Sequence, residues 1–392
     1  MAVEARSEIT PRELFEQLVI REEATPILDV RNEDEFAAWR IEGKRPLTYL
    51  NLSYFRFIDD PEGNAERVAR AGDTWIAVCA KGDSSAFVAE ILRERGMRAV
   101  NLVGGMEAWG NLHVPVRVGP ADSRFELWQV NRYGKGCLSY VVRAGGETIV
   151  IDASRHLDVY EALLGELGAG LVQVLDTHVH ADHLSGGAEL ARRAGARYYV
   201  AAGEGFELHK AVDPLPEGSK LTLGGKAGLT IEVHPIATPG HTPGSTCYLI
   251  DNRWLLSGDT IFVNGIGRPD LGGHVEAWGR ALFGTLHRGL LNSLPDDILV
   301  LPAHFSSPEE LDRDGVVQRR LGDIRAASPE LALPTEAAFV EAMRRAVKPP
   351  PEVYQHIIAA NLSPSHVPDE KASEWELGKN QCAASAPSAA RR

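Results

Sequence analysis

The sequence predicts an α/β protein of two domains, and three observations lead to this fold class. Its 392 residues are enough for two ordinary domains, each with a hydrophobic core of its own. Residues 8–112 alternate short apolar β runs with amphipathic helices, which indicates a doubly wound, mainly parallel sheet. After residue 123 the β runs follow one another closely, with turn glycines between them, which is typical of antiparallel strands.

The first domain is predicted element by element. A helix begins at Thr10-Pro11, with the proline in its first turn, and continues through Val19. Residues 113–122 contain two prolines and a glycine without helical periodicity, so they are predicted to be an interdomain linker. The elements expected between these two segments are a strand at 26–30, a helix at 33–39, a strand at 75–79, a helix at 85–95 and a strand at 99–103.

The second domain is predicted to cover residues 123–362. After Pro308 its periodicity becomes helical. Residues 363–392 are rich in Ser, Ala, Pro and charged residues, and we expect them to form a disordered tail. Before Pro308, the clearest elements are strands at 125–130, 136–144 and 147–153, a helix at 157–167 and an apolar strand at 171–177.

The composition excludes several classes of function. The formal net charge of −13 disfavours nucleic acid and acidic membrane surfaces as partners. The first residues lack the apolar core of a signal peptide, and no run approaches the ~20 apolar residues that span a bilayer. The four cysteines show no paired spacing, so a disulfide framework is not expected. We therefore expect the protein to be cytoplasmic. Cys137 and Cys247 are predicted to be core residues, and Cys382 lies in the expected tail.

The strongest chemical signal is the run from Thr177 to His183, THVHADH, at the end of an apolar strand. It places the imidazoles of His178, His180 and His183 and the carboxylate of Asp182 within six residues. A strand end can direct alternate side chains to one point. Neutral imidazole combined with carboxylate suits Zn or Fe, so the run predicts a metal site.

Three later segments add candidates to this site. His241 stands in TPGHTPG, Asp259 in SGDT and His304 in LPAH. Each lies beside Gly or Pro, which allow tight loops and close approach of the backbone. A lone histidine is usually a surface or core residue, but four separate motifs in this order are poorly explained in that way.

Together, HxHxDH, TPGHTPG, SGDT and PAH resemble the metallo-β-lactamase superfamily over about residues 123–362. The resemblance implies a four-layer αββα sandwich with a metal pocket, but such a fold does not determine a reaction. Two subfamilies fit. Glyoxalase II-like hydrolases act on thioesters with two metals, whereas persulfide dioxygenases oxidise glutathione persulfide to sulfite at one non-haem iron.

The resemblance to dioxygenases implies one Fe(II) per chain, with Zn(II) as the alternative metal. Its ligands would be His178, His241 and Asp259, and such a face of two histidines and one carboxylate leaves positions open for O₂ and a sulfur ligand. The other members of the motifs would orient these ligands or, in a hydrolase, hold a second metal: His180, Asp182, His183 and His304.

The segment after Asp259 favours the dioxygenase. Its GIGRPD stretch resembles the dioxygenase loop, which makes Arg268 and Asp270 candidates for substrate binding, with a structural ion pair as the alternative. After the PAH motif, relatives that use glutathione commonly carry Asp-Tyr, where this chain has Phe305-Ser306. The carrier thiol therefore stays open between glutathione, mycothiol, coenzyme A and other low-molecular-weight thiols.

Cys79 is the candidate nucleophile of the first domain. It ends the apolar run WIAVC and precedes a loop and a helix, where backbone N–H groups and the helix N-terminus stabilise an anionic persulfide. Taken alone, such a cysteine is more often a small buried apolar residue. With LDVRNEDEF (28–36), the spacing CxxGxxS and NLVGGMEAW (101–109), however, it resembles a rhodanese domain over residues 8–112.

This second resemblance implies that Cys79 carries sulfane sulfur. Asp29 and Arg31 are interpreted as a buried structural pair. Ser84 stands where active rhodaneses commonly have arginine, so Lys81 is the cation expected near the substrate, and both residues are candidates for substrate binding.

These features predict a persulfide dioxygenase joined to a sulfurtransferase domain. It would convert a thiol persulfide, O₂ and water to sulfite and free thiol, and the fusion would raise the effective concentration of the shared persulfide. The alternatives are a two-metal thioester hydrolase and a catalytically silent rhodanese module on a metallohydrolase. The expected partners are a small-molecule persulfide and O₂, without nucleic acid or membrane, and a homodimer is compatible with the sequence.

Overall fold

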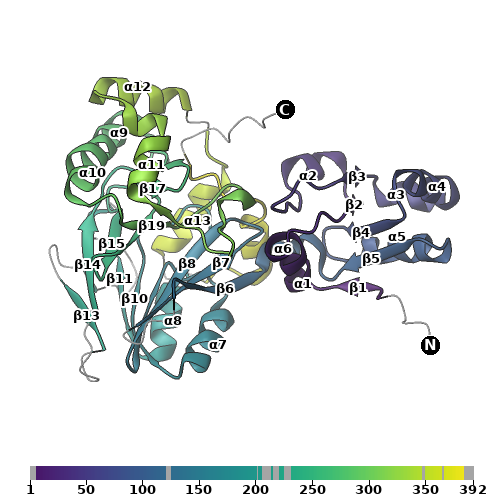
Figure 1. Cartoon of the computed structure of the whole chain (residues 1–392), viewed down its shortest axis with the longest axis horizontal. Helices are drawn as coiled ribbons and strands as arrows, with labels where there is room; N and C mark the ends of the chain where they lie inside the picture. The colour runs from purple at the N-terminus through teal and green to yellow at the C-terminus, as the bar shows by residue number, and fades with distance from the viewer. Residues whose placement is uncertain are drawn as a thin grey trace.

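The structure is a computed structural model that describes residues 6–120, 125–200, 202–204, 213–214, 220–224, 231–346, 349–363 and 366–383. Figure 1 shows a smaller α/β body at the N-terminal end and a larger layered body formed by the rest of the chain. This mixed architecture confirms the predicted fold class. Among the described helices, none is both long and apolar enough to cross a lipid bilayer.

The first body is built around a five-stranded parallel sheet with the order β1-β5-β4-β2-β3. The predicted strands and helices are present within a few residues of their expected bounds. The strands are β1 (Glu8–Ile9), β2 (Ile27–Asp29), β3 (Tyr49–Asn51), β4 (Thr74–Val78) and β5 (Arg98–Leu102). The helices are α1 (Pro11–Phe15), followed by a π-helical turn (Glu16–Ile20), α2 (Glu33–Ala38), α3 (Tyr54–Asp59), α4 (Pro61–Ala71), α5 (Asp83–Glu94) and α6 (Gly105–Asn111).

The end of β2 carries the predicted buried ion pair. Arg31 Nη2 donates to Asp29 Oδ2 at 2.6 Å and to the backbone carbonyl of Trp39 at 2.6 Å. Both charged side chains are buried. The pair therefore ties the turn after β2 to the end of α2, which confirms its structural interpretation.

The second body contains two sheets stacked face to face. The first has the order β12-β11-β10-β9-β8-β7-β6 and the second the order β13-β14-β15-β16-β19-β20. The first consists of β6 (His113–Val118), β7 (Glu126–Arg132), β8 (Cys137–Ala144), β9 (Glu147–Ile151), β10 (Gly170–Leu175), β11 (Arg197–Val200) and β12 (Asp213–Pro214). The second consists of β13 (Leu221–Leu223), β14 (Ile231–Ala237), β15 (Thr246–Ile250), β16 (Trp254–Gly258), β19 (Leu299–Pro302) and β20 (Arg319–Arg320), with a small hairpin of β17 (Ile261–Phe262) and β18 (Gly265–Ile266).

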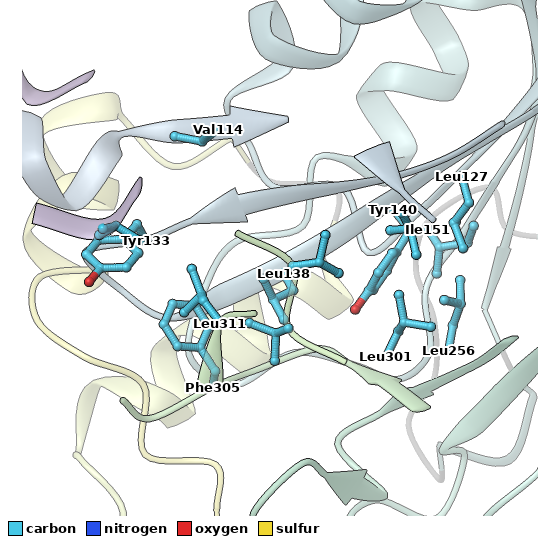
Figure 2. Packing of buried hydrophobic residues seen from close by; sticks show 14 of the residues in the cluster. Val114, Leu127, Tyr133, Leu138, Tyr140, Ile151, Leu256, Leu301, Phe305 and Leu311 are labelled. Carbon is cyan, nitrogen blue, oxygen red and sulfur yellow. The ribbon is translucent and has the colours of Figure 1, made fainter. Parts of the chain in front are cut away.

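Side chains of neighbouring strand residues point into two different cores. Tyr140 of β8 faces the space between the sheets, whereas Val141 packs with the helices outside, because successive strand residues point to opposite faces. Figure 2 shows Tyr140 and Ile151 of the first sheet near Leu256 and Leu301 of the second. This inner core holds the two sheets together.

Helices cover the outer faces of both sheets, which completes the predicted αββα sandwich. Two helices pack on the first sheet through Leu163 and Leu190, which share a buried cluster with Val150. These helices are α7 (Leu157–Leu167) and α8 (Gly187–Ala194). The second sheet is covered by α9 (Val275–Phe283), α10 (Leu291–Ser293), α11 (Leu321–Ala327) and α12 (Glu336–Ala346).

The prediction of an interdomain linker at 113–122 is wrong for residues 113–118. These residues form β6, which pairs with β7 along its whole length. Pro115 is tolerated because β6 is an edge strand, where one side of the backbone needs no partner strand. The chain therefore enters the second body directly as a strand of its sheet.

An aromatic cluster joins the two bodies. Tyr133 meets Phe15 and Trp109 of the first body edge to face, with ring centroids 5.1 and 5.4 Å apart. The ring centroids of Tyr133 and Phe305 are 5.9 Å apart, and both side chains are drawn in Figure 2. These rings belong to the same buried cluster as the centre of the sandwich. The hydrophobic core is therefore continuous across the two bodies.

The prediction of a disordered tail at 363–392 is wrong for residues 366–383. After α13 (Val353–Leu362) this segment forms α14 (Asp369–Trp375) and then packs into the sandwich. Glu376 is only 3% exposed and accepts hydrogen bonds from Arg132 Nη1 at 2.8 Å and Arg155 Nε at 3.2 Å. These ion pairs help to hold the segment in place. They leave no apolar periodicity in the sequence, so the sequence could not indicate that the segment is ordered. Residues 384–392 lie outside the described part of the chain.

Replacing Glu376 by Ala should destabilise the protein by roughly 3–5 kcal/mol, because the change leaves the buried Arg132 without its ionic partner. Burial opposes the ionisation of Glu376, but Arg132, Arg155 and Lys135 lower its pKa to about 2. Since the folded-state pKa lies below the ordinary value of 4.5, the stabilisation is complete above that value and is lost as the pH falls towards 2.

Chemical denaturation measures this loss. Glu374→Ala serves as the control, since the side chain of Glu374 is 66% exposed and its loss should cost about 0.5 kcal/mol or less. Equal losses in the two variants would contradict a special role of the buried glutamate.

Candidate metal site

The candidate site lies where loops at the ends of several strands converge. The loop after β10 carries THVHADH, and the loop between β14 and β15 carries His241. Asp259 directly follows β16, and His304 follows β19. Since β16 and β19 are parallel neighbours, their ends lie together, and His304 Nδ1 is 2.6 Å from Asp259 Oδ1. These side chains are all buried.

His178, His241 and Asp259 form a cluster whose ligand atoms lie within 4.8 Å of one another. Asp259 Oδ2 is 3.3 Å from His241 Nε2 and 3.6 Å from His178 Nε2. All three atoms are buried, and none has a hydrogen-bond partner among the described residues. Buried polar atoms without partners are rare and require an explanation such as a bound ion. Two imidazoles and one carboxylate are donors that suit iron or zinc, so the cluster fits a metal ion.

Hydrogen bonds on the far side of each imidazole orient the nitrogen that faces the cluster. Thr177 Oγ1 donates to Asp152 Oδ2 at 3.0 Å, so it accepts from His178 Nδ1 at 2.9 Å. His241 Nδ1 donates to the backbone carbonyl of Arg268 at 2.8 Å. Each Nδ1 therefore carries the proton, and each Nε2 presents its lone pair to the centre of the cluster.

Burial and neighbouring charges set the protonation states of the cluster. Burial lowers the pKa of His178 well below its ordinary value, and the neighbouring His180 lowers it further. Burial also lowers the pKa of His241. It opposes the ionisation of Asp259, but the charge and hydrogen bond of His304 bring the pKa of that carboxyl below its usual range. The cluster thus offers two neutral imidazoles and one carboxylate, which are the forms that bind a metal.

Asp182, His183, His304 and Cys137 form a second buried group. Asp182 accepts from His183 Nδ1 at 3.0 Å, from His304 Nε2 at 3.1 Å and from Cys137 Sγ at 3.0 Å. Although burial opposes a charged imidazole, Asp182 raises the pKa of His183 to about 10, and Asp259 and Asp182 raise that of His304 well above its usual range. Unlike the first cluster, this group contributes no atom to the buried side-chain N and O atoms that lack a hydrogen-bond partner among the described residues.

His180 belongs to a third group. Its Nε2 lies 3.2 Å from Asp152 Oδ1, and Asp176 completes the group. Asp152 also accepts from Thr177 N at 2.7 Å, so it supports the backbone of the THVHADH loop. Sequence reasoning missed several residues that the structure brings together around the site: Cys137, Asp152, Asp176, Glu204 and Cys382. Asp152 and Asp176 left a signal in the sequence, because both are carboxylates at the ends of predicted strands, ETIVIDA and LVQVLDT. The other three lie on separate segments and in no motif.

The predicted substrate loop lies directly against the cluster. A Cβ atom added at Gly267 would lie 1.7 Å from the backbone oxygen of Asp259, so only glycine permits this approach. Arg268 makes a bidentate ion pair with Asp270, with both N–O distances at 2.7 Å. The backbone N–H of Arg268 donates to the carbonyl of Cys382 at 3.0 Å. The loop therefore contains the Arg268–Asp270 ion pair that is the alternative to a substrate-binding role, and it also holds the C-terminal segment. Binding of substrate by this loop stays a prediction.

Cys79 lies in the turn between β4 and α5 of the first body. Gly82 N donates to its Sγ at 3.0 Å, and Ser85 Oγ lies 3.2 Å from it. The φ of Gly82 is 104°, a conformation that favours glycine. Both partners belong to the CxxGxxS spacing. Lys81 is exposed and Ser84 is half-buried in the same loop, and a role for them in substrate binding stays a prediction.

Comparisons with known proteins agree with this geometry. Residues 132–304 match the family model described as metallo-beta-lactamase superfamily. A hydroxyacylglutathione hydrolase of Anaeromyxobacter dehalogenans is 33% identical over 230 residues, which are 57% of this chain and 84% of that protein. The chain belongs to the metallo-β-lactamase superfamily. It also contains a rhodanese-like domain, whose family model matches residues 11–112.

Other similar proteins are named persulfide dioxygenase instead of hydroxyacylglutathione hydrolase. The human protein named persulfide dioxygenase ETHE1, mitochondrial, is 28% identical over 225 residues, which are 56% of this chain and 80% of that protein. A metallo-beta-lactamase structure from Staphylococcus aureus is 26% identical with a TM-score of 0.56, over 62% of this chain and 73% of that one. The structure of ETHE1 from Myxococcus xanthus is 24% identical with a TM-score of 0.50. The match covers 64% of this chain and 98% of that one, and it shows the shared fold.

Proposed function

We propose that the protein is a mononuclear non-haem iron persulfide dioxygenase with a sulfurtransferase domain. The observation that carries the proposal is the cluster of three unpartnered, buried ligand atoms from two histidines and one aspartate. A face of three protein ligands leaves up to three positions for O₂ and a sulfur ligand. Ferrous iron held there would supply the activation of O₂ for the oxidation of sulfane sulfur to sulfite. The likeness to human persulfide dioxygenase supports this reaction class.

The chain's own residues orient the ligands and bury the site. The carbonyl of Arg268 and the hydroxyl of Thr177 fix the two imidazoles, so little rearrangement is needed when a metal binds. Phe262 and Tyr354 belong to a small buried cluster, and the Phe262 ring lies 6.4 Å from the His304 ring. Both side chains are buried next to the metal-binding groups.

A two-metal thioester hydrolase is the second candidate, because the residues for a second metal are present. Its ligands would be Asp182, His183 and His304, with Asp259 bridging. In the structure His304 Nε2 lies 3.1 Å from Asp182 Oδ2, so a second metal bound by both side chains would replace this contact. The likeness to hydroxyacylglutathione hydrolase supports only the superfamily that both candidates share.

The first domain would carry sulfane sulfur at Cys79, with a small-molecule persulfide as the intermediate that the two domains share.

In the second domain, Phe305 is 5% exposed and packs against Tyr133. It therefore offers no hydroxyl to a thiol carrier. Mycothiol, coenzyme A or another small thiol is compatible with this position, as is glutathione bound in a different way.

Protein purified without added metal should contain about one iron per chain and should consume O₂ in the presence of a persulfide, producing sulfite. Metal analysis and an oxygen electrode, with sulfite determined at the end, measure this. Two zinc ions per chain, brisk thioester hydrolysis and no O₂ uptake would contradict the dioxygenase and favour the hydrolase.

A further inference from the structure

The C-terminal segment is held across the candidate metal site by hydrogen bonds from several elements. Asn380 Nδ2 donates to the carbonyls of Gly136 at 3.0 Å and Phe305 at 3.3 Å. Gln381 N donates to the hydroxyl of Tyr354 at 2.8 Å. The carbonyls of residues 381 and 382 accept from the predicted substrate loop, at 3.3 Å from Arg268 Nη1 and 3.0 Å from its backbone N–H. The loop proposed to bind substrate therefore binds part of the same chain.

These contacts bring one thiol to the metal cluster. Cys382 is fully buried, and its Sγ lies within 4.8 Å of ligand atoms of Asp259 and His304. Asp259 is also a member of the three-residue cluster, and its Oδ2 is buried without a hydrogen-bond partner among the described residues. Cys382 thus differs from Cys247, which packs among apolar side chains between the second sheet and its helices.

We propose that Cys382 is the sulfur carrier of the oxidation, so that the substrate at the metal site is a persulfide on the protein's own C-terminal segment. The proposal rests on the proposed dioxygenase function and deepens it. It explains why the substrate loop is bonded to the segment, and it needs no hydroxyl at the position of Phe305.

The transfer of sulfur to Cys382 balances without an added oxidant. The sulfur of Cys382 attacks the outer sulfur of a donor persulfide R–S–SH, a new S–S bond forms to that sulfur, and the S–S bond of the donor breaks. The proton of the Cys382 thiol passes to the leaving R–SH. In the second step Cys–S–SH, O₂ and H₂O give Cys–SH and sulfurous acid. The outer sulfur is oxidised, both oxygen atoms of O₂ are reduced, and the thiol is regenerated.

The segment contains the features needed to load such a carrier. Cys382 is unreachable in the closed arrangement, so loading requires the segment to withdraw. Glu376 stays fixed by its buried ion pairs, while Leu377 is 64% exposed and Gly378, with a φ of 92°, has no atom within 4 Å of an added Cβ. Rotation at residues 377–378 would release residues 379–383 and keep the anchor in place.

Anaerobic incubation of the full-length, iron-containing protein with inorganic polysulfide tests this directly. After alkylation and tryptic digestion, the peptide that begins at Asn380 should carry one additional sulfur on Cys382. Admission of O₂ should remove this sulfur and release an equal amount of sulfite. Cys382→Ser should lower sulfite formation by roughly tenfold or more without loss of iron, whereas Cys247→Ala should change neither quantity.

The outcomes separate the two proposals. Wild-type protein that consumes no O₂ with any persulfide contradicts the dioxygenase function itself. Full O₂ uptake in Cys382→Ser, or a labelled Cys382 that keeps its sulfur under O₂, overturns only the carrier role, and so does an unlabelled Cys382 in active wild-type protein. Because labelling is read in the wild type, the test holds even where a variant misfolds. The same measurement in Cys79→Ser identifies the sulfur donor. The additional sulfur on Cys382 persists if free persulfide loads this residue, and it disappears if Cys79 loads it.

Discussion

His241→Ala should leave the protein without bound iron and without persulfide-dependent O₂ uptake. The Nε2 of His241 is one of only three donor atoms in the proposed metal cluster, and it has no other partner among the described residues. The carbonyl of Arg268 holds this ring in place, so that its Nε2 faces the cluster. Loss of one of three protein ligands removes a large part of the binding free energy of the metal.

His304→Ala provides the matched comparison, since it removes a buried imidazole that contacts Asp259 but lies outside the three-residue cluster. Losses of residues that orient metal ligands typically cost about 10–100-fold in affinity or activity, so measurable iron should remain at high metal supply. Both variants are reconstituted anaerobically with ferrous iron and compared in iron content and O₂ uptake. Equal and complete loss in both would count against one metal and favour a binuclear site.

Cys79→Ser should abolish the transfer of sulfur from a donor to cyanide while leaving O₂ uptake on added persulfide largely intact. A hydroxyl cannot carry sulfane sulfur, although it can still accept hydrogen bonds from Gly82 N and Ser85 Oγ, so the loop should keep its shape. The proposed metal cluster belongs to the other domain and does not include this residue.

Two results would contradict this expectation. Sulfur transfer that survives the substitution would show that Cys79 is not the carrier, and the first domain would then be a recruiting module. Collapse of O₂ uptake would show that sulfur reaches the metal site mainly through Cys79. Iron content, measured in the same samples, separates that coupling from damage to the metal site.

The candidate metal ligands could be identified from the sequence because each stands in a short motif at the end of a strand. The strand topology then brings His178, His241 and Asp259 together, since the ends of β10 and β16 and the loop between β14 and β15 meet at one edge of the sandwich. Local patterns were sufficient here, because a strand end fixes the direction of the residues that follow it.

Features that depend on distant partners could not be predicted in the same way. Residues 113–118 carry a proline that suggests a linker, and only pairing with β7 makes them a strand. Glu376 is buried because it meets Arg132, which lies 244 positions earlier in the chain. The composition of residues 363–392 contains no trace of that contact, so it predicts disorder for the segment that holds Cys382. The burial of Cys137 could be predicted from its β run, but its bond to Asp182 could not.

The aromatic cluster of Phe15, Trp109 and Tyr133 concerns the question of whether the two domains are separate folding units. Each half matches its own family, so ancestry divides the chain near residue 112. A cut there would separate rings that lie 5.1 and 5.4 Å apart and expose them to water on both fragments. Large exposed apolar surfaces promote association, so the fragments would tend to aggregate. We therefore expect the two modules to stabilise each other in the fused chain.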